Sequence, residues 1–259
     1  MDPIKGLVMG LLQGVLEWLP VSSQGNLVLL AIAFLGLEPG DALSLSVYLH
    51  IGTGLAALVY FREEIVGILM RRTEEDRALL RFLVLATIIT GVVGFPLFTF
   101  IGLASFYGEA LLGLTGVALL ATGLMQKGRE GLDAEPRQGL TTIDGLTMGA
   151  LQGLSAIPGL SRSGVTTTAL LVKGFPGKEA FRISFLMSIP ASFAAAAGLA
   201  LTEGIPPIDA GLLTALATSF ITALLSIDLL IKLARRTEFW KICISLGLIT
   251  LIALLPSLV

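Results

Sequence analysis

Long runs of apolar residues dominate the chain and predict helices that cross a membrane. The runs lie at about residues 41–60, 82–101, 109–125, 180–202, 209–231 and 241–258. Each is close to the roughly 20 residues that a helix needs to cross a bilayer. The runs do not alternate with the period of two that the strands of a transmembrane barrel show. The pattern therefore predicts an all-α polytopic membrane protein with six transmembrane helices.

Two further apolar stretches, at about 4–36 and 143–173, are interrupted near the middle by Pro, Gly and Ser. Each half is too short to cross a bilayer alone. We expect both to be re-entrant helical hairpins, whose non-helical backbone must be packed in protein or line a wet cavity. The alternative is a pair of ordinary kinked spans. We favour the re-entrant interpretation because it keeps every loop on the side that its charge predicts.

The composition also indicates a membrane protein. Charged residues make up 14% of the chain and hydrophobic residues 54%, whereas soluble domains carry roughly 25% charged residues. The formal net charge of −2 and the lack of a basic stripe argue against a nucleic-acid partner. The single cysteine, Cys243, excludes an intrachain disulfide. We expect lipid to be the main surrounding medium, and both a monomer and a homo-oligomer are compatible with this pattern.

The positions of the basic residues predict the topology. Apart from Lys5 and Arg162, the 17 basic residues fall into four clusters. The clusters lie at residues 62–81, 127–137, 173–182 and 232–241. Residues 102–109 and 203–209 contain acidic residues but no Lys or Arg. The positive-inside rule places the clusters in the cytoplasm and the acidic loops outside, as in a multi-pass protein of the cell (plasma) membrane.

The two broken stretches resemble each other. The first reads L-Q-G-V-L-E-W-L-P-V-S-S-Q-G (12–25) and the second L-Q-G-L-S-A-I-P-G-L-S-R-S-G (151–164). In both, the Gln and the final Gly stand 12 residues apart, and three crossing spans follow. Because three is odd, the halves must insert in opposite senses, which is the pattern of inverted-topology repeats.

We therefore expect a single membrane domain, residues 1–259, made of two repeats. Repeat 1 covers about 1–125 and repeat 2 about 143–259, joined by a cytoplasmic linker at about 126–142. A pseudo-two-fold axis in the membrane plane relates such repeats, and it would bring the two hairpins together near the middle of the bilayer. Chance similarity between turns rich in small residues is the alternative.

Polar residues inside the predicted membrane segments are functional candidates because they are costly there. The ionisable ones are Glu17, His50, Asp144, Arg162 and Asp228, and the uncharged ones are Gln13, Asn26 and Gln152.

Gln13 and Glu17 stand four residues apart and share one face of a helix. An amide oxygen and a carboxylate at this spacing can hold a hard divalent cation such as Mg²⁺ or Ca²⁺. The alternative is a hydrogen bond between the two neighbours. We favour a role as cation ligand or in acid–base chemistry because Glu17 lies three residues before the break at Pro20.

The segments that follow the two breaks predict a phosphate site. Each precedes a new apolar helix, so its backbone N–H groups are available to an anion. The candidates are Ser22, Ser23 and Gly25 after the first break, and Ser161, Arg162, Ser163, Gly164 and Thr166 after the second. Arg162 can form two parallel hydrogen bonds to a phosphate and stays charged when it loses water. The alternative role of Arg162 is an ion pair with Glu17 or Asp144.

The remaining ionisable groups differ in their expected roles. His50 is the only histidine; a single His on an apolar span is usually structural, but no other imidazole is available for acid–base chemistry. We expect Asp144 to cap the second hairpin. Asp228 is expected to form an ion pair with Lys232 or Arg235.

Two motifs resemble those of a known family. The run Q-G-V-L-E-W-L-P-V-S-S-Q-G-N resembles the first motif of the undecaprenyl-diphosphate phosphatase (bacitracin-resistance) family, (E/Q)-x-x-x-E followed by L-P-V-S-S-x-G-H. The run P-G-L-S-R-S-G resembles the P-G-x-S-R-S-G motif of the same family. The resemblance covers essentially the whole chain.

The resemblance implies a hydrolase that converts a C55 isoprenyl diphosphate to the monophosphate and so recycles a glycan lipid carrier of the cell envelope. It also implies a divalent cation, two re-entrant regions in inverted repeats, and an active site that opens to the extracytoplasmic side. Carried onto this chain, Gln13 and Glu17 occupy the acidic pair, Ser23 is the motif serine, and Arg162 is the phosphate-binding arginine.

One residue departs from the family motif, because the motif histidine is replaced by Asn26. Asn cannot act as a base or nucleophile. Either His50 supplies the imidazole, or Glu17 activates water or Ser23 directly, or the protein is no longer an efficient hydrolase. We favour His50 or Glu17 in this role.

Other functions are compatible with parts of this pattern. A lipid-carrier flippase or transporter with little or no hydrolase activity is the main alternative, because inverted repeats and broken helices are typical of transporters. A phosphatase of the phosphatidic-acid type needs two histidines and is excluded. No repeated filter or charged ring suggests an ion channel.

Overall fold

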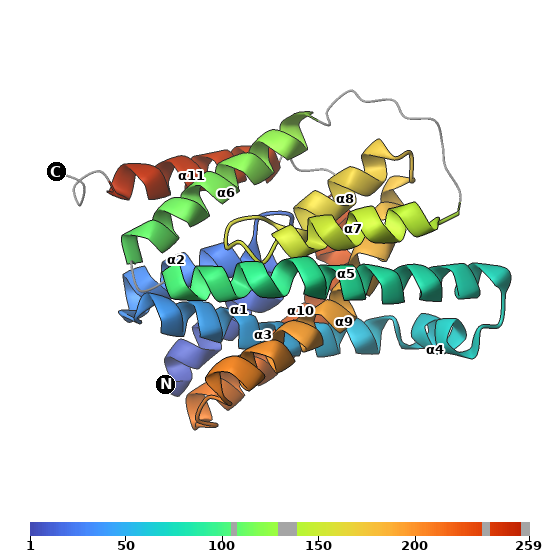
Figure 1. Ribbon diagram of the computed structural model, residues 1–259. Coiled ribbons are helices and arrows are strands. Elements are labelled where there is room, and N and C mark those ends of the chain that lie inside the picture. The colour runs from blue at the N-terminus through green and yellow to red at the C-terminus, as the bar shows by residue number, and fades with distance from the viewer. Residues whose placement is uncertain (105–107, 129–138, 235–238, 255–259) are drawn as a thin grey trace.

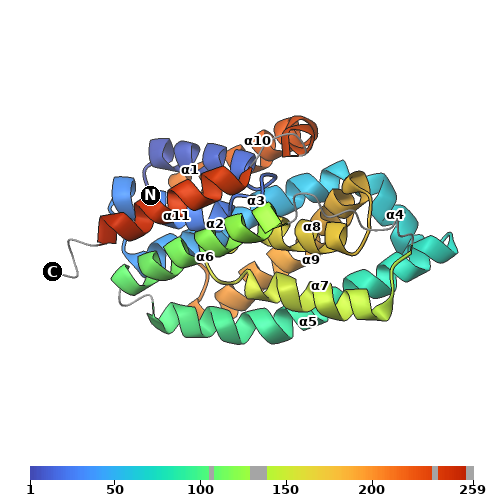
Figure 2. The same ribbon diagram turned by 90° about the horizontal axis from the view of Figure 1, so that it is seen from above.

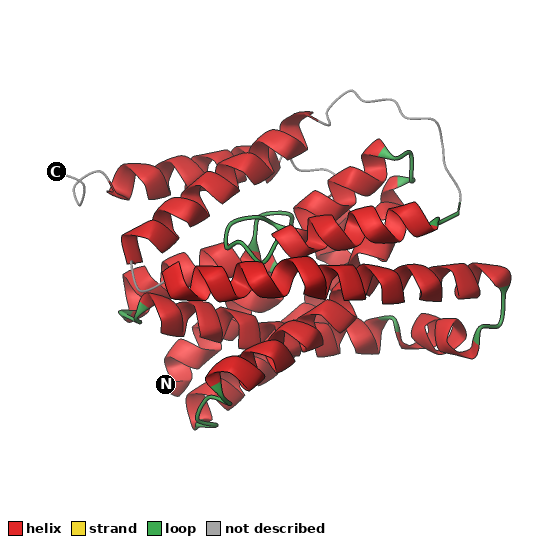
Figure 3. Cartoon of the chain, in the orientation of Figure 1, coloured by secondary structure: helices red, strands yellow, loops and turns green. Residues whose placement is uncertain are grey.

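A computed structural model describes residues 1–104, 108–128, 139–234 and 239–254. Within these residues the chain forms eleven helices joined by turns, and no strand (Figure 3). The helices are α1 (Pro3–Leu16), α2 (Ser23–Leu35), α3 (Pro39–Tyr60), α4 (Arg62–Met70), α5 (Glu74–Ala104), α6 (Gly108–Gly128), α7 (Thr142–Leu154), α8 (Arg162–Val172), α9 (Gly177–Glu203), α10 (Ala210–Ala234) and α11 (Phe239–Leu254). The all-α fold is therefore confirmed.

Five of the described helices, α3, α5, α6, α9 and α10, are long and apolar enough to cross a membrane. The expectation of a polytopic membrane protein is thereby confirmed, although six spans were predicted. The sixth predicted span, 241–258, corresponds to α11, which has 16 residues in the described part of the chain. The short helix α4 was not predicted, because its nine residues include three charged ones and no long apolar run.

Each broken stretch contains two short helices, as its interrupted pattern predicts. The helices α1, α2, α7 and α8 have 14, 13, 13 and 11 residues, fewer than a crossing needs. Asp144 closes a capping box at the start of α7: Asp144 Oδ2 accepts a hydrogen bond of 2.9 Å from Thr141 N, and Thr141 Oγ1 accepts one from Asp144 N. The expected capping role of Asp144 is confirmed.

The short first helix of each stretch packs along a long helix of the other half of the chain. Helix α1 lies against α10, and α7 lies against α5, on opposite sides of the molecule (Figure 2). Glycines at every fourth position allow this close approach. A Cβ on Gly10 would lie 2.4 Å from Ala215 O, and a Cβ on Gly149 would lie 2.6 Å from Ala86 O. The two halves thus share one packing pattern.

Charged loops separate to the two ends of the molecule. Helix α4 and the loop between α8 and α9 lie at one end, and the loops at 36–38 and 204–209 lie at the other (Figure 1). At the first end Arg182 pairs with Glu64 at 2.5 Å. These segments are grouped at the two ends as the charge pattern predicts, whereas the basic clusters at 127–137 and 232–241 lie partly outside the described residues.

One expected ion pair is absent. Asp228 Oδ1 accepts a hydrogen bond of 2.5 Å from Tyr60 Oη, and it forms no ion pair with Lys232, since no such contact occurs among the described residues. Tyr60 ends α3, which packs against α10, so the phenol reaches Asp228 first. Arg235, the other expected partner, lies outside the described residues.

Candidate active site

The breaks of the two stretches interlock in the middle of the fold. Ser22 Oγ, from the first break, accepts a hydrogen bond of 3.2 Å from Gly159 N in the second break. In return, Ser163 Oγ donates one of 3.2 Å to Leu19 O. A Cβ on Gly25 would lie only 2.7 Å from Gly159 N. These contacts bring the two predicted phosphate segments side by side.

Glu17 is the centre of a polar cluster that both breaks contribute to. Glu17 Oε1 forms an ion pair with Arg162 Nη2. Glu17 Oε2 accepts hydrogen bonds from Ser23 Oγ at 2.6 Å and from Gln13 Nε2 at 3.1 Å. His50 Nε2 lies 3.3 Å from the same oxygen. The carboxylate is buried, so these partners replace the water that it would otherwise bind.

His50 reaches Glu17 from α3, and its tautomer is fixed by its other nitrogen. Nδ1 lies 2.7 Å from the carbonyl oxygen of Ser46, so Nδ1 must carry a hydrogen. Two lone pairs would repel each other across the 3.3 Å between Nε2 and Glu17 Oε2, so one of these two atoms must carry a hydrogen. The imidazole and the carboxylate are therefore arranged to exchange one proton.

Asn26, which stands where the family motif has a histidine, bonds to the backbone of the first break rather than to Glu17. Its side-chain Nδ2 donates hydrogen bonds to Val21 O at 2.8 Å and to Ser22 O at 2.9 Å. It thereby holds the backbone of the break, where Ser22 adopts φ 62°, a region that residues other than glycine rarely enter. His50 brings an imidazole to the cluster instead, as one of the three sequence hypotheses requires.

Arg162 begins α8 and faces the cluster from the second stretch. Besides Glu17, it donates a hydrogen bond of 3.3 Å from Nη1 to Ser184 O. The ion pair with Glu17 is the alternative that the sequence allowed for Arg162. Asp144, the other candidate partner, pairs with Lys173 at 2.9 Å. The guanidinium has five N–H groups, so further donors remain for a phosphate.

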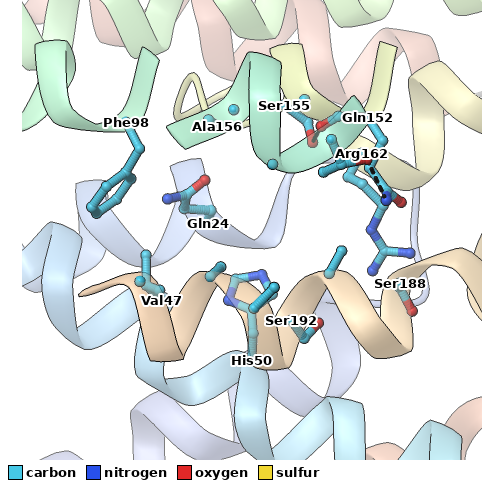
Figure 4. Close-up of a pocket in the computed structure, with 18 of the residues that line it drawn as sticks. Gln24, Val47, His50, Phe98, Gln152, Ser155, Ala156, Arg162, Ser188 and Ser192 are labelled. Atoms are coloured by element: carbon cyan, nitrogen blue, oxygen red, sulfur yellow. Dashed lines mark hydrogen bonds between the residues drawn. The ribbon is translucent and has the colours of Figure 1, made fainter. Parts of the chain in front are cut away.

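A cavity of about 620 Å³ adjoins this cluster (Figure 4). Of the predicted site residues, its walls include Glu17, Ser22, Ser23, His50, Gln152, Ser161, Arg162 and Ser163. Five others do not line it: Gln13, Gly25, Asn26, Gly164 and Thr166. The cavity continues between α5 and α9, where Phe95, Phe98, Gly198 and Leu199 form an apolar wall. It therefore joins a charged end to an apolar end.

The residues that do not line the cavity support those that do. Gly25 N and Gly164 N donate to the cap oxygens Ser22 Oγ at 3.3 Å and Ser161 Oγ at 3.1 Å. Thr166 Oγ1 is buried and donates to Arg162 O at 2.8 Å. These groups shape the helix starts behind the cavity wall.

The sequence model of the bacitracin resistance protein BacA family matches residues 6–249 of this chain. The chain belongs to this family. It is 41% identical over 253 residues to the undecaprenyl-diphosphatase of Methanothrix thermoacetophila, covering 97% of this chain and 96% of the relative. It is 38% identical over 258 residues to that of Haloarcula marismortui, covering 95% and 96% of the two chains.

In this BacA family member, the residues expected to hold a divalent cation are Gln13 and Glu17. Gln13 Oε1 is buried and has no hydrogen-bond partner, and Glu17 lies one helical turn further. Among the described residues, no three His, Cys, Asp or Glu side chains converge on one point. A cation here would need phosphate oxygens to complete its shell, as Mg²⁺ commonly does. In this structure Gln13 Nε2 faces Glu17, which is the hydrogen bond that the sequence allowed as the alternative, so the amide would have to turn for Oε1 to join Glu17 in holding a cation.

Several residues at the site are not predicted by the sequence pattern. Thr53 Oγ1 accepts a 3.4 Å hydrogen bond from Gln13, and Gln126 Nε2 donates one of 2.5 Å to Pro20 O in the first break. Both are single polar residues on apolar helices, with no spacing that marks them. Gly159 carries a signal, since Pro158-Gly159 is a turn dipeptide, and it adopts φ 98°.

Proposed function

We propose that this BacA family member hydrolyses undecaprenyl diphosphate, or a similar polyprenyl diphosphate, to the monophosphate and inorganic phosphate. The reaction would recycle a lipid carrier of cell-envelope glycans. One observation carries the proposal: a buried Glu17 bonded to Arg162, Ser23 and His50 stands at the charged end of a cavity whose other end is apolar. Such a cavity suits a molecule with a charged head and a long apolar tail. The names of the relatives agree with this assignment.

The geometry favours Ser23 as the nucleophile. Its hydroxyl already donates to Glu17 Oε2 at 2.6 Å, so the carboxylate can take the proton as Ser23 Oγ bonds to the terminal phosphorus. The bond from this phosphorus to the bridging oxygen breaks, and the prenyl monophosphate leaves. Water then attacks the phosphoserine, and the proton that it loses passes to His50. Glu17 returns the serine proton to Ser23 Oγ as phosphate departs.

Arg162 has the electrostatic role in this scheme. Its position at the start of α8, with donors beyond those used by Glu17 and Ser184, suits the oxygens of the terminal phosphate. Donors that are already oriented stabilise the charge that develops on these oxygens at little reorganisation cost.

A divalent cation belongs to the proposal. Gln13 Oε1 and Glu17 would hold Mg²⁺ or Ca²⁺ together with the substrate, and the cation would neutralise charge on the phosphate oxygens. The unpartnered amide oxygen of Gln13 supports this assignment.

We further propose that α1–α2 and α7–α8 are re-entrant hairpins in two inverted repeats, about 1–125 and 143–259, and that α11 completes a sixth span. Three features support this arrangement: the four helices are short, each first helix packs against the other half of the chain (α1 on α10, α7 on α5), and the two breaks are hydrogen-bonded to each other. The apolar end of the cavity extends along α9 towards residues 204–209, so the site would open to the extracytoplasmic side of the plasma membrane. A flippase without hydrolase activity would leave the contacts of Ser23 and His50 with Glu17 without a chemical role.

Phosphate release tests the proposed function. Purified full-length protein in detergent is given a prenyl diphosphate with Mg²⁺ or Ca²⁺, or with a chelator. We expect release by the parent, loss with the chelator, and loss in Glu17→Ala and Arg162→Ala. Ser219→Ala serves as the control, because Ser219 is a buried serine on α10 that does not line the cavity. A folded parent that releases no phosphate would contradict the proposal.

A further inference from the structure

A diphosphate carries two phosphates, and the cluster around Glu17 and Arg162 accounts for only the terminal one. The second, the ester phosphate, stays on the prenyl chain after cleavage. It must lie one bridging oxygen away from the terminal phosphate, on the side of the apolar tail. A binding site for this second phosphate presupposes that the protein acts on a diphosphate, as proposed above.

Most hydroxyl groups that line the cavity are already committed to the protein. Ser23 Oγ donates to Glu17, Ser163 Oγ to Leu19 O, Ser155 Oγ to Gln152 O and Ser188 Oγ to Phe185 O. Thr87 and Thr90 donate to backbone carbonyls of α5. These residues hold helices and breaks in place and have no hydrogen left for a ligand.

Two polar side chains of the cavity wall differ from these. Gln24 and Ser192 line the cavity, and within the described residues neither side chain has a hydrogen-bond partner. Gln24 is partly buried, and Ser192 is only 7% exposed. The Ser192 hydroxyl opens to the cavity and donates to no protein group, so it is available to a ligand that enters there.

Both residues face the cavity in the part that His50 also lines (Figure 4). Gln24 comes from the first turn of α2 and Ser192 from α9, and they approach the cavity from different sides with His50 between them (Figure 4). Beyond Ser192, the cavity-lining residues of α9 are all apolar or glycine: Ala194, Ala195, Ala197, Gly198, Leu199 and Leu201. Ser192 is therefore the last polar group on α9 before the apolar end.

We propose that Gln24 and Ser192 form the subsite for the ester phosphate. The amide N–H₂ and the hydroxyl can each donate to a phosphate oxygen, and both are neutral. Neutral donors would hold this phosphate without drawing the terminal one away from Arg162. The pair would set the depth at which the diphosphate sits, and so align the terminal phosphorus with Ser23.

Equilibrium binding of two probes to the purified full-length protein tests the subsite. Farnesyl monophosphate carries an ester phosphate, whereas inorganic phosphate can occupy the terminal site alone. Gln24→Ala and Ser192→Ala should each raise the Kd of farnesyl monophosphate about tenfold, the effect of losing one hydrogen bond to a charged group. The Kd of inorganic phosphate should change by less than about twofold. Ser192→Thr keeps the hydroxyl and should bind like the parent, as should the control Ser219→Ala.

The outcomes separate the subsite from the proposed function. The subsite is overturned if the parent does not bind farnesyl monophosphate, if both alanine variants bind it like the parent, or if they lose affinity equally for both probes. A parent that binds farnesyl monophosphate with the expected variant effects but releases no phosphate from a diphosphate would contradict hydrolysis and leave the subsite standing.

Discussion

At the scale of single residues, the site depends on one buried carboxylate with four side-chain partners. Glu17 has no bulk water to stabilise its charge, so Arg162 supplies the compensating charge and Ser23, Gln13 and His50 supply hydrogens. A buried charge with several donors is held in one orientation. This order is what an attack on a single phosphorus atom requires.

Arg162→Ala should destabilise the fold by about 3–5 kcal/mol, since it leaves the buried charge of Glu17 without its cation. Replacing Glu17 by Gln in the same chain removes the unpaired charge and should restore most of that loss. Thermal unfolding of the single and double variants in detergent measures both effects. If the losses in stability of the two single variants simply add in the double variant, Arg162 and Glu17 do not stabilise each other, which would contradict the prediction.

His50→Ala should lower kcat about a hundredfold or more, the usual contribution of a positioned acid–base group. The reason is that His50 is the single histidine of the sequence, and its Nε2 lies 3.3 Å from Glu17 Oε2. Steady-state phosphate release at saturating substrate measures the effect, with Ser219→Ala as control. Unchanged turnover in His50→Ala would assign the proton transfer to Glu17 alone.

The motifs alone predicted that Glu17, Ser23 and Arg162 belong to one site, and the structure brings them together. The position of His50 could not be settled in the same way. A single histidine on an apolar helix does not reveal which neighbour its face of the helix will meet. That depends on how α3 packs beside α1, and the sequence of α3 leaves this open. The position of Ser192 on the cavity wall could not be predicted for the same reason, because it depends on how α9 packs.

At the scale of helices, the apolar pattern located the long spans and the two breaks, because length and interruption are properties of the sequence itself. It did not locate α4, where nine residues form a separate helix after Phe61. It also left open which helices touch. The pairing of α1 with α10 and of α7 with α5 follows from glycines whose partners lie far away in the chain.

These glycine contacts can be tested in both halves. Gly10→Ala and Gly149→Ala should each destabilise the protein by about 1–3 kcal/mol, since the added carbon would meet a carbonyl oxygen at 2.4 or 2.6 Å and the helices must separate. Gly67→Ala on α4 is the matched control, because its nearest neighbour would be 3.8 Å away. Thermal unfolding in detergent measures the three variants. Equal stability of all three would mean that the helix pairs can move apart freely.

At the scale of the whole molecule, the separation of charge predicts its orientation in the membrane. The single Cys243 is buried, so a Cys243→Ser background allows one new cysteine to be labelled at a time. With a membrane-impermeant maleimide on intact cells, Glu203→Cys should react, whereas Arg72→Cys should react only after the membrane is opened. Both residues are exposed in the structure. The reverse labelling pattern would place the cavity mouth in the cytoplasm.

The shape of the cavity carries the last prediction, because its apolar end gives the prenyl chain a path between α5 and α9. A Cβ on Gly198 would lie 3.6 Å from the ring of Phe95, an ordinary contact. Gly198→Ala should therefore hydrolyse substrate like the parent. Gly198→Leu must place its remaining carbons in the cavity and should obstruct a long chain.

We expect Gly198→Leu to lower kcat/KM for undecaprenyl diphosphate about tenfold or more, the cost of forcing several extra carbons into an occupied space. For isopentenyl diphosphate, whose chain is far shorter and fills much less of the apolar end, kcat/KM should stay close to that of the parent. Comparing the two substrates removes any general loss of stability from the result. An equal fall for both would mean that the variant disturbs the cluster around Glu17, and no change for either would mean that the prenyl chain leaves the site by another path.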